Sequence, residues 1–327
     1  MQYKGIIGSL DSTSGTFTKD TKQDKVDYIT GVNYEMSNIA ESLLTHEIDT
    51  SIINTKYKTM IRGLSYTTID DSDTNRRKVW QLKDKSNEVI DTADWLIVAG
   101  SGIAHPRWTA AFGGEPPLIA AEMESPDSKL RQALDAIGKQ EVSPRMAVFF
   151  VCSGDEARKW LSLDFDVANI NNEDSILSKI IIQGDTTDSG DDWCSVVLHS
   201  TEEFAIENSN VYGKTSSAAR VGGAVSDASL EDGLVDRMLA ALQAIPGLPT
   251  PNDKTLSYGP ILHRWGNAFP KGNALSHELA FVPSSHVAFC GDYVSSPEIS
   301  RLGSLESALL SGTHAGEQVA KYILEGM

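Results

Sequence analysis

The chain has 327 residues, of which 40% are apolar, and a formal net charge of −17 at pH 7. This length and composition predict a soluble globular protein of two domains. The acidic charge, opposed by a single dense basic cluster at 76–78, excludes nucleic acid and anionic lipid as partners. The longest apolar stretches are far shorter than the roughly 20 residues that a membrane helix needs, so no transmembrane segment is predicted.

The N-terminus has neither the pattern of a secretory signal nor the acid-poor composition of an organelle transit peptide. We therefore expect a cytoplasmic protein, or one of an organelle matrix or stroma if a targeting segment lies upstream of this sequence. Three widely spaced cysteines, Cys152, Cys194 and Cys290, indicate neither a disulfide framework nor a zinc site. Each is expected to be a buried small apolar residue.

The first part of the chain predicts an α/β arrangement. A polar lead covers 1–25, and apolar residues recur on one face of a helix predicted over 31–44. Short strands separated by polar turns are then predicted at 50–53, 57–64, 78–82, 89–90 and 95–99.

The last of these strands leads into Gly100-Ser101-Gly102, the first two glycines of a G-x-G-x-x-G phosphate cradle. Pro106 follows at once and stops the helix that a cradle needs, and His105 stands at the third glycine position. The favoured interpretation is a buried strand that ends in a glycine turn.

The middle of the chain predicts a β-rich domain inserted between two parts of a ligand-binding domain. Helices are expected at 125–137 and 229–244, and strands at 144–151, 176–183, 193–199 and 261–265. The acidic loop 184–192 is interpreted as a solvated turn, because Thr187 and Ser189 stand where an EF-hand needs carboxylates. No metal site is predicted.

The last forty residues carry the strongest signal for a ligand. A predicted strand at 286–290 ends in Gly291-Asp292, which lets the backbone approach a ligand and offers a carboxylate to sugar-type hydroxyls. Gly303 opens a helix whose N–H groups suit an anion or an electron-rich ring. The alternatives are a turn-forming Asp292 and a helix made of small residues for tight packing. Together these elements predict half of a dinucleotide or flavin site.

Several blocks in this order resemble renalase-like proteins of the flavin amine oxidase superfamily: 196–204, 245–249, 263–270, 291–292 and 303–312. The resemblance runs from about residue 31 to 323. It implies an α/β fold with an incomplete FAD-binding Rossmann-like domain, formed by 26–103 and 286–327. A mixed-sheet substrate domain of the amine oxidase type would cover 104–285.

The resemblance also implies roles for single residues. Gly291 and Asp292 would contact the ribityl and pyrophosphate part of FAD, and Tyr57 would lie in the strand that meets the adenine. The helix start would approach the flavin pyrimidine edge through Gly303, Ser304, Leu305 and Ala308. His263 and Trp265 are candidates for the substrate pocket, although a structural role in the core explains each of them as well. No catalytic residue is assigned.

Two departures argue against FAD binding by this chain alone. No G-x-G-x-x-G cradle is found, and an insertion with Ser295, Ser296, Pro297 and Arg301 separates Asp292 from Gly303. Two hypotheses follow. One is an FAD-dependent oxidoreductase that takes a hydride from a nicotinamide-like or amine substrate and passes electrons to oxygen. The other is a non-catalytic, flavoprotein-derived subunit that has lost FAD and docks in a larger protein assembly.

Overall fold

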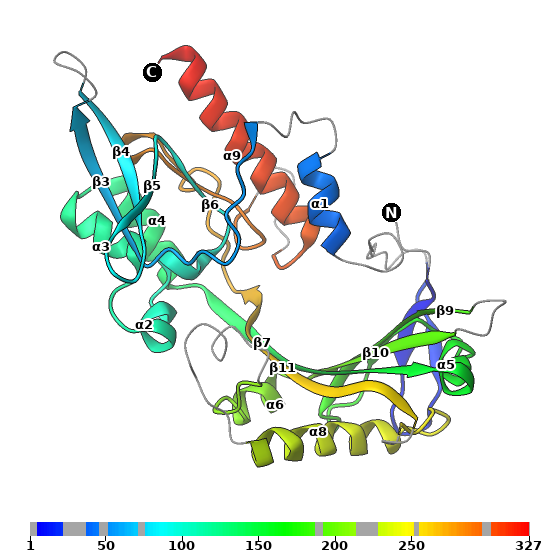
Figure 1. Cartoon of the computed structure of the whole chain (residues 1–327). Coiled ribbons are helices and arrows are strands. Elements are labelled where there is room, and N and C mark those ends of the chain that lie inside the picture. Colours follow the sequence, from blue (N-terminus) through cyan, green and yellow to red (C-terminus); the bar gives the residue numbers. More distant parts are fainter. Residues whose placement is uncertain are drawn as a thin grey trace. The chain divides into compact units, whose positions relative to one another are not determined.

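The computed structural model describes residues 5–21, 37–45, 52–70, 76–186, 192–213, 228–251, 255–295 and 302–326 (Figure 1). The chain divides into two compact units. Unit 1 comprises Met1–Thr55 and Pro144–Gly266, and unit 2 comprises Lys56–Ser143 and Asn267–Met327. Helices and several sheets, one of them mixed, confirm the predicted α/β class.

Unit 1 is built on a mixed seven-stranded sheet with the order β11-β7-β10-β9-β8-β1-β2. Strand β1 pairs in parallel with β8, while β10 pairs in antiparallel fashion with β7 on one side and β9 on the other. The strands are β1 (Ile7–Leu10), β2 (Phe17–Lys19), β7 (Glu141–Ser153), β8 (Val167–Ile170), β9 (Leu177–Asp185), β10 (Trp193–Ser200) and β11 (Leu256–Lys271).

One face of this sheet forms the core of unit 1, because alternate side chains of each strand point to the same face. In β10 every second residue is buried, including Val196 and Leu198. Helix α8 (Ala228–Gln243) lies along a face of the sheet (Figure 1) and buries Met238 and Leu242 in the same core. Two shorter helices, α5 (Gly154–Leu161) and α6 (Glu202–Glu207), also contribute to this core.

Unit 2 contains two three-stranded sheets. The antiparallel sheet consists of β3 (Gly63–Asp70), β4 (Arg76–Lys83) and β5 (Val89–Ala93). The second sheet has the order β12-β13-β6, formed by Phe281–Val282, Val287–Phe289 and Leu96–Val98. Its helices are η3 (Ser101–Ala104), α2 (Arg107–Phe112), α3 (Pro117–Glu124), α4 (Ser128–Gly138), η4 (Pro283–Ser285) and α9 (Leu305–Glu325).

Helix α9 packs on strand β13 through small apolar side chains. Ala288 and Cys290 of the strand region meet Ala315 and Val319 of the helix. Ala315 is therefore part of the contact, whereas Gly312 and Gly316 face open space, so close packing on the sheet does not require the glycines of the tail. All three cysteines are buried and free, as predicted.

Most predicted elements are confirmed with boundaries shifted by a few residues, including α4, β7, β9, β10, α8, β13 and α9. The strand predicted at 57–64 is wrong over most of its length. Tyr57 and Lys58 form a turn, with Lys58 at a φ of 56°, and β3 begins at Gly63. A left-handed residue interrupts an extended strand, and polar and apolar residue types alone do not reveal it. Neither Ile52 nor Ile53 belongs to a strand.

Helix α1 (Ser37–Thr45) overlaps the helix predicted over 31–44, of which 31–36 lie outside the described residues, and none of the residues of α1 is buried. The expected polar lead at 1–25 contains β1 and β2, and Leu10 is part of the core of unit 1. Residues 104–143 and 267–285 group with unit 2, whereas the sequence analysis assigned them to a substrate domain. The reason is packing, since Leu118, Leu130 and Val282 share one core with Trp80 of β4.

In the part of the chain that the structure describes, no helix combines the length and the apolar character that crossing a membrane requires.

Candidate functional site

Two parallel strands end side by side in unit 2, and a polar crevice opens at their ends. Strand β13 pairs in parallel with β6, in a register that places Phe289 opposite Val98. Ligands of α/β sheets commonly bind outside the carboxyl ends of such strands. The crevice measures about 90 Å³ and is lined by Gly100, Ser101, Arg107, Gln140, Glu141, Val142, Asn267, Pro270, Asp292 and Tyr293.

The backbone conformation and a close contact require a glycine at position 291. Its φ is 126°, and a Cβ atom would lie 2.9 Å from the carbonyl oxygen of Ala99. The buried Ser311 of α9 makes two hydrogen bonds with the same residue. Gly291 N–H donates to Ser311 Oγ (2.9 Å), and the Ser311 hydroxyl donates to the Gly291 carbonyl oxygen (3.0 Å). Ser311 therefore attaches helix α9 to the Gly-Asp turn.

Asp292 is half-buried, and burial raises the pKa of its carboxyl group. No cation of the described residues pairs with this carboxylate. Its carbonyl oxygen accepts a hydrogen bond from Gly303 N–H at 3.0 Å, which brings the start of α9 to the same turn. The structure thus brings together Gly291, Asp292 and Gly303, three of the predicted site residues.

Some of the N–H groups at the start of α9 are satisfied by hydrogen bonds to residues of the helix start itself. Ser304 is the N-cap, and its hydroxyl accepts a hydrogen bond from Ser307 N–H, while Ala308 N–H donates to the Ser304 carbonyl. Leu305 is the first helical residue and is 40% exposed. The backbone N–H groups of Leu305 and Glu306 are therefore the ones that remain for a ligand.

Arg107 supplies the positive charge of the crevice. Its Nη2 atom is 3.4 Å from Ser101 Oγ and its Nη1 atom is 3.0 Å from His105 Nε2. The backbone N–H of Arg107 donates to His105 Nδ1 at 3.0 Å. Burial, and secondarily the charge of Arg107, lower the pKa of His105, so its imidazole is neutral at neutral pH. The glycine turn after β6 is confirmed, whereas the strand before it is buried only in part, since Val98 is buried and Ile97 is 49% exposed.

Two residues that sequence reasoning missed hold the walls of the crevice. Buried Gln140 donates from its side-chain amide to the carbonyl of Tyr293 at 2.9 Å, and its own carbonyl is 3.2 Å from His105 Nε2. Tyr293 donates its hydroxyl to the carbonyl of Val98 at 3.1 Å. An aromatic residue directly after Gly-Asp was the only sequence signal for this contact.

The other predicted site residues lie elsewhere. Tyr57 is 77% exposed on its turn in unit 2. His263 and Trp265 lie on β11 in unit 1, with ring centroids 4.3 Å apart, and their role in a substrate pocket stays a prediction. Of the insertion, only Ser295 lies inside the described residues, whereas Ser296, Pro297 and Arg301 lie outside them. The same holds for 187–191 of the acidic loop.

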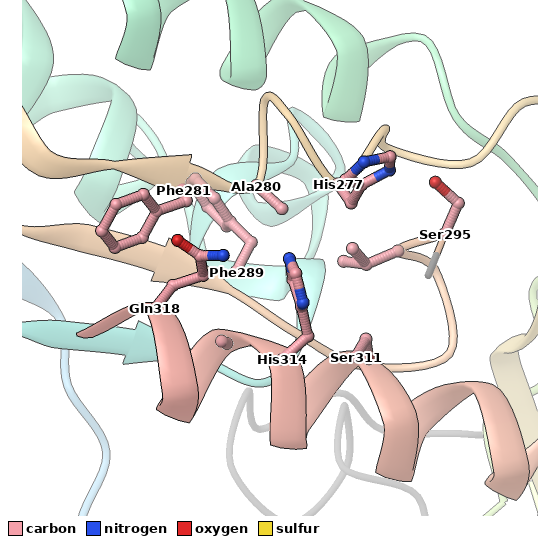
Figure 2. A pocket seen from close by; sticks show the side chains of 10 residues that line it. His277, Ala280, Phe281, Phe289, Ser295, Ser311, His314 and Gln318 are labelled. Atoms are coloured by element: carbon pink, nitrogen blue, oxygen red, sulfur yellow. The ribbon is translucent and has the colours of Figure 1, made fainter. Parts of the chain in front are cut away.

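A second hollow lies on the sheet-facing side of α9. Figure 2 shows Ser311, His314 and Gln318 of this helix pointing toward the strands and His277. The rings of His277 and His314 are 6.0 Å apart in an edge-on arrangement. The hollow measures about 10 Å³, which is about the room for one water molecule. It therefore does not hold a substrate.

A wider surface groove of about 460 Å³ lies along α3 and α4. Two of its charged groups satisfy each other, because Arg131 forms a bidentate ion pair with buried Glu122. Among the described residues, no group of three or more His, Cys, Asp or Glu side chains is arranged to hold a metal ion. The crevice, by contrast, is lined by Arg107 and Asp292, which have no ionic partner among the described residues.

No protein-family model matches this chain, and no match is found among curated proteins.

Proposed function

We propose that this chain is an FAD-binding oxidoreductase of the renalase-like type, with the cofactor at the crevice of unit 2. One observation carries the proposal. The parallel pairing of β13 with β6, together with the bond from Gly303 N–H to the Asp292 carbonyl, gathers Gly291, Asp292 and the start of α9 at one sheet edge. These are the elements that the resemblance assigns to the flavin side of an FAD site.

The residues present fit such a ligand in two respects. Gly100 has an ordinary extended backbone, with φ −151° and ψ 137°, and a Cβ atom there would meet nothing within 4 Å. Neither strain nor packing requires glycine there, so the backbone of Gly100 is open to the approach of a ligand. Asp292 keeps a half-buried carboxylate without a cation, and a hydroxyl of the ligand would satisfy it.

The bound cofactor would supply hydride acceptance and the transfer of electrons to oxygen. The chain's own residues would bind and orient it. Asp292 would accept hydrogen bonds from sugar-type hydroxyls, and the N–H groups of Leu305 and Glu306 would favour negative charge at the flavin edge. The crevice of about 90 Å³ is smaller than the roughly 300–1,000 Å³ of sites that enclose a whole small ligand. It would therefore hold only part of FAD.

A specific observation favours the second hypothesis, a non-catalytic subunit of a protein assembly. Parallel strands are normally covered on both faces, yet Ile97 of β6 is 49% exposed. Helix α1 buries none of its residues, and its Leu43 is 50% exposed. Such apolar surface suits a protein partner.

Purification and titration with FAD distinguish the two hypotheses. For an oxidoreductase we expect flavin absorbance that co-elutes with the protein at a near-equal molar ratio. Asp292→Asn should weaken FAD binding by roughly tenfold or more, since a charge-assisted hydrogen bond contributes about 1.5–3 kcal/mol. Asp135→Asn, at an exposed position of α4, is the matched control. A colourless protein that takes up no FAD would overturn the proposal and favour the assembly subunit.

A further inference from the structure

Arg107, which supplies the positive charge of the crevice, forms no ion pair with any of the described residues. Arg107 is half-buried and touches only the hydroxyl of Ser101 and the neutral ring of His105. No carboxylate of the described residues lies within ion-pair distance of it. Buried or half-buried charges in proteins are normally paired. The unpaired guanidinium therefore indicates an anion that comes from outside the chain.

The backbone that lines the crevice beside Arg107 is accessible to a ligand. Gly100 and Ser101 line the crevice together with Arg107. Neither the packing around Gly100 nor its φ angle requires a glycine at this position. An oxyanion can reach the guanidinium closely where the neighbouring backbone carries no side chain. The oxyanion can then accept two parallel N–H hydrogen bonds from the guanidinium. The available 90 Å³ admits a small group of this kind.

We propose that Gly100, Ser101 and Arg107 form a binding site for the phosphate groups of an organic phosphate, which in the proposed cofactor are its pyrophosphate. The identity of this ligand rests on the proposed function, whereas the anion site itself does not. The site takes the place of the G-x-G-x-x-G cradle that the sequence lacks, and it uses a guanidinium instead of a helix N-terminus. His105 and Gln140 are positioning residues, since they hold the backbone of Arg107 and the wall behind it.

The crevice also selects among phosphates. Asp292 and Glu141 line it with carboxylates, so that a free anion meets repulsion as well as attraction. A ligand that brings hydroxyl groups toward Asp292 avoids this cost and gains a hydrogen bond. ADP, which carries phosphates and ribose hydroxyls, should therefore bind more tightly than inorganic pyrophosphate, and adenosine without phosphate should bind least.

The test is calorimetric titration of the full chain with ADP, pyrophosphate, adenosine and succinate, none of which contains flavin. Arg107→Gln should weaken ADP binding by roughly tenfold or more, the loss expected for a charge-assisted hydrogen bond. Gly100→Val should weaken it comparably, because an extended backbone accepts valine while the side chain fills the crevice. Lys139→Gln, at an exposed position, controls for the loss of one positive charge. Gly233→Ala controls for the added side chain at a glycine with open space.

The outcomes separate this inference from the proposed function. Binding of ADP that depends on Arg107 supports the phosphate site even if FAD does not bind. Binding of FAD that is unchanged in both Arg107→Gln and Gly100→Val overturns the phosphate site and leaves the proposed function standing. The phosphate site is also overturned if the native chain binds neither ADP nor pyrophosphate, or if succinate binds more tightly than ADP. Thermal unfolding of each variant shows whether it folds. If Arg107→Gln does not fold, Gly100→Val still tests the phosphate site.

Discussion

Asp192 at the seven-stranded sheet of unit 1 and Asp292 at the end of the small mixed sheet of unit 2 differ in whether a cation pairs with them. In unit 1, Asp192 has a carboxylate that is 1% exposed, and Arg158 pairs with it. In unit 2, Asp292 and Arg107 line one crevice, and neither has an ionic partner among the described residues. A paired charge stabilises its surroundings, whereas an unpaired half-buried charge costs free energy that a ligand can recover.

Glycines show the same contrast. Gly184 of β9 is needed for packing, because a Cβ atom there would lie 2.2 Å from the carbonyl oxygen of Trp193. Gly100 faces open space. The comparison teaches that the reason for a glycine or an acidic residue, and not its presence, distinguishes a packed sheet from a binding edge. The following predictions test this distinction in order of decreasing expected effect.

The largest effect is expected in the core of unit 1. Phe150 is fully buried against Trp160, with ring centroids 5.7 Å apart. Phe150→Ala should lower the free energy of unfolding by about 3–5 kcal/mol, because it leaves a cavity that the sheet cannot close. Phe149→Ala, on the opposite face of the same strand, should cost much less. Urea denaturation measures both, and equal losses would contradict the assignment of the core face.

The next effect concerns the pH dependence of unit 1. Burial, followed by the charges of Lys179 and Arg145, lowers the pKa of His199 to about 4. The unfolded chain then binds more protons between pH 6.5 and 4, so stability is complete above this range and falls as the pH falls through it. The loss is on the order of 2–3 kcal/mol. His199→Asn should flatten this part of the stability curve, and an unchanged slope would show that another group titrates.

A smaller effect is expected where α9 joins the Gly-Asp turn. Ser311→Ala leaves the buried N–H of Gly291 without its partner, while the Gly291 carbonyl keeps the bond from Val294 N–H, and should cost about 1–3 kcal/mol. Ser307→Ala is the matched control, since this buried hydroxyl has no hydrogen-bond partner among the described residues. Its removal should be neutral or stabilising. Thermal unfolding compares the two variants, and the prediction fails if Ser307→Ala is the more damaging change.

The smallest effect has the opposite sign. Burial raises the pKa of Asp292 in the folded chain, so the native protein loses stability as the pH rises through that value. Asp292→Asn removes the loss and should raise the free energy of unfolding at pH 7 slightly, because a neutral amide costs less to bury than a carboxylate. Denaturation at pH 7 and pH 4 measures it. Destabilisation at pH 7 would show that the carboxylate has a structural partner.

The elements of unit 1 could be predicted because their pattern is strong. The alternation of buried and partly exposed residues in β10 is visible in the sequence, and the Pro-Gly stop after α8 marks where that helix ends. The turn at Tyr57 and Lys58 was missed, because a left-handed lysine leaves no compositional trace. The structural partner of Asp192 was missed as well, since its place in an acidic loop indicated a solvated residue.

The sequence by itself indicated Gly291-Asp292 and the Gly303 helix as part of a site, and it predicted the turn at Gly100-Ser101 only as a structural turn, because local residue types favour these turns. Only the tertiary structure decided that they belong together. Val98 and Tyr293 are 195 residues apart in the sequence and are joined by a hydrogen bond. The pairing of two three-residue strands depends on the burial of Phe289 and on helix α9 behind them, and neither is encoded in the residues of the turns.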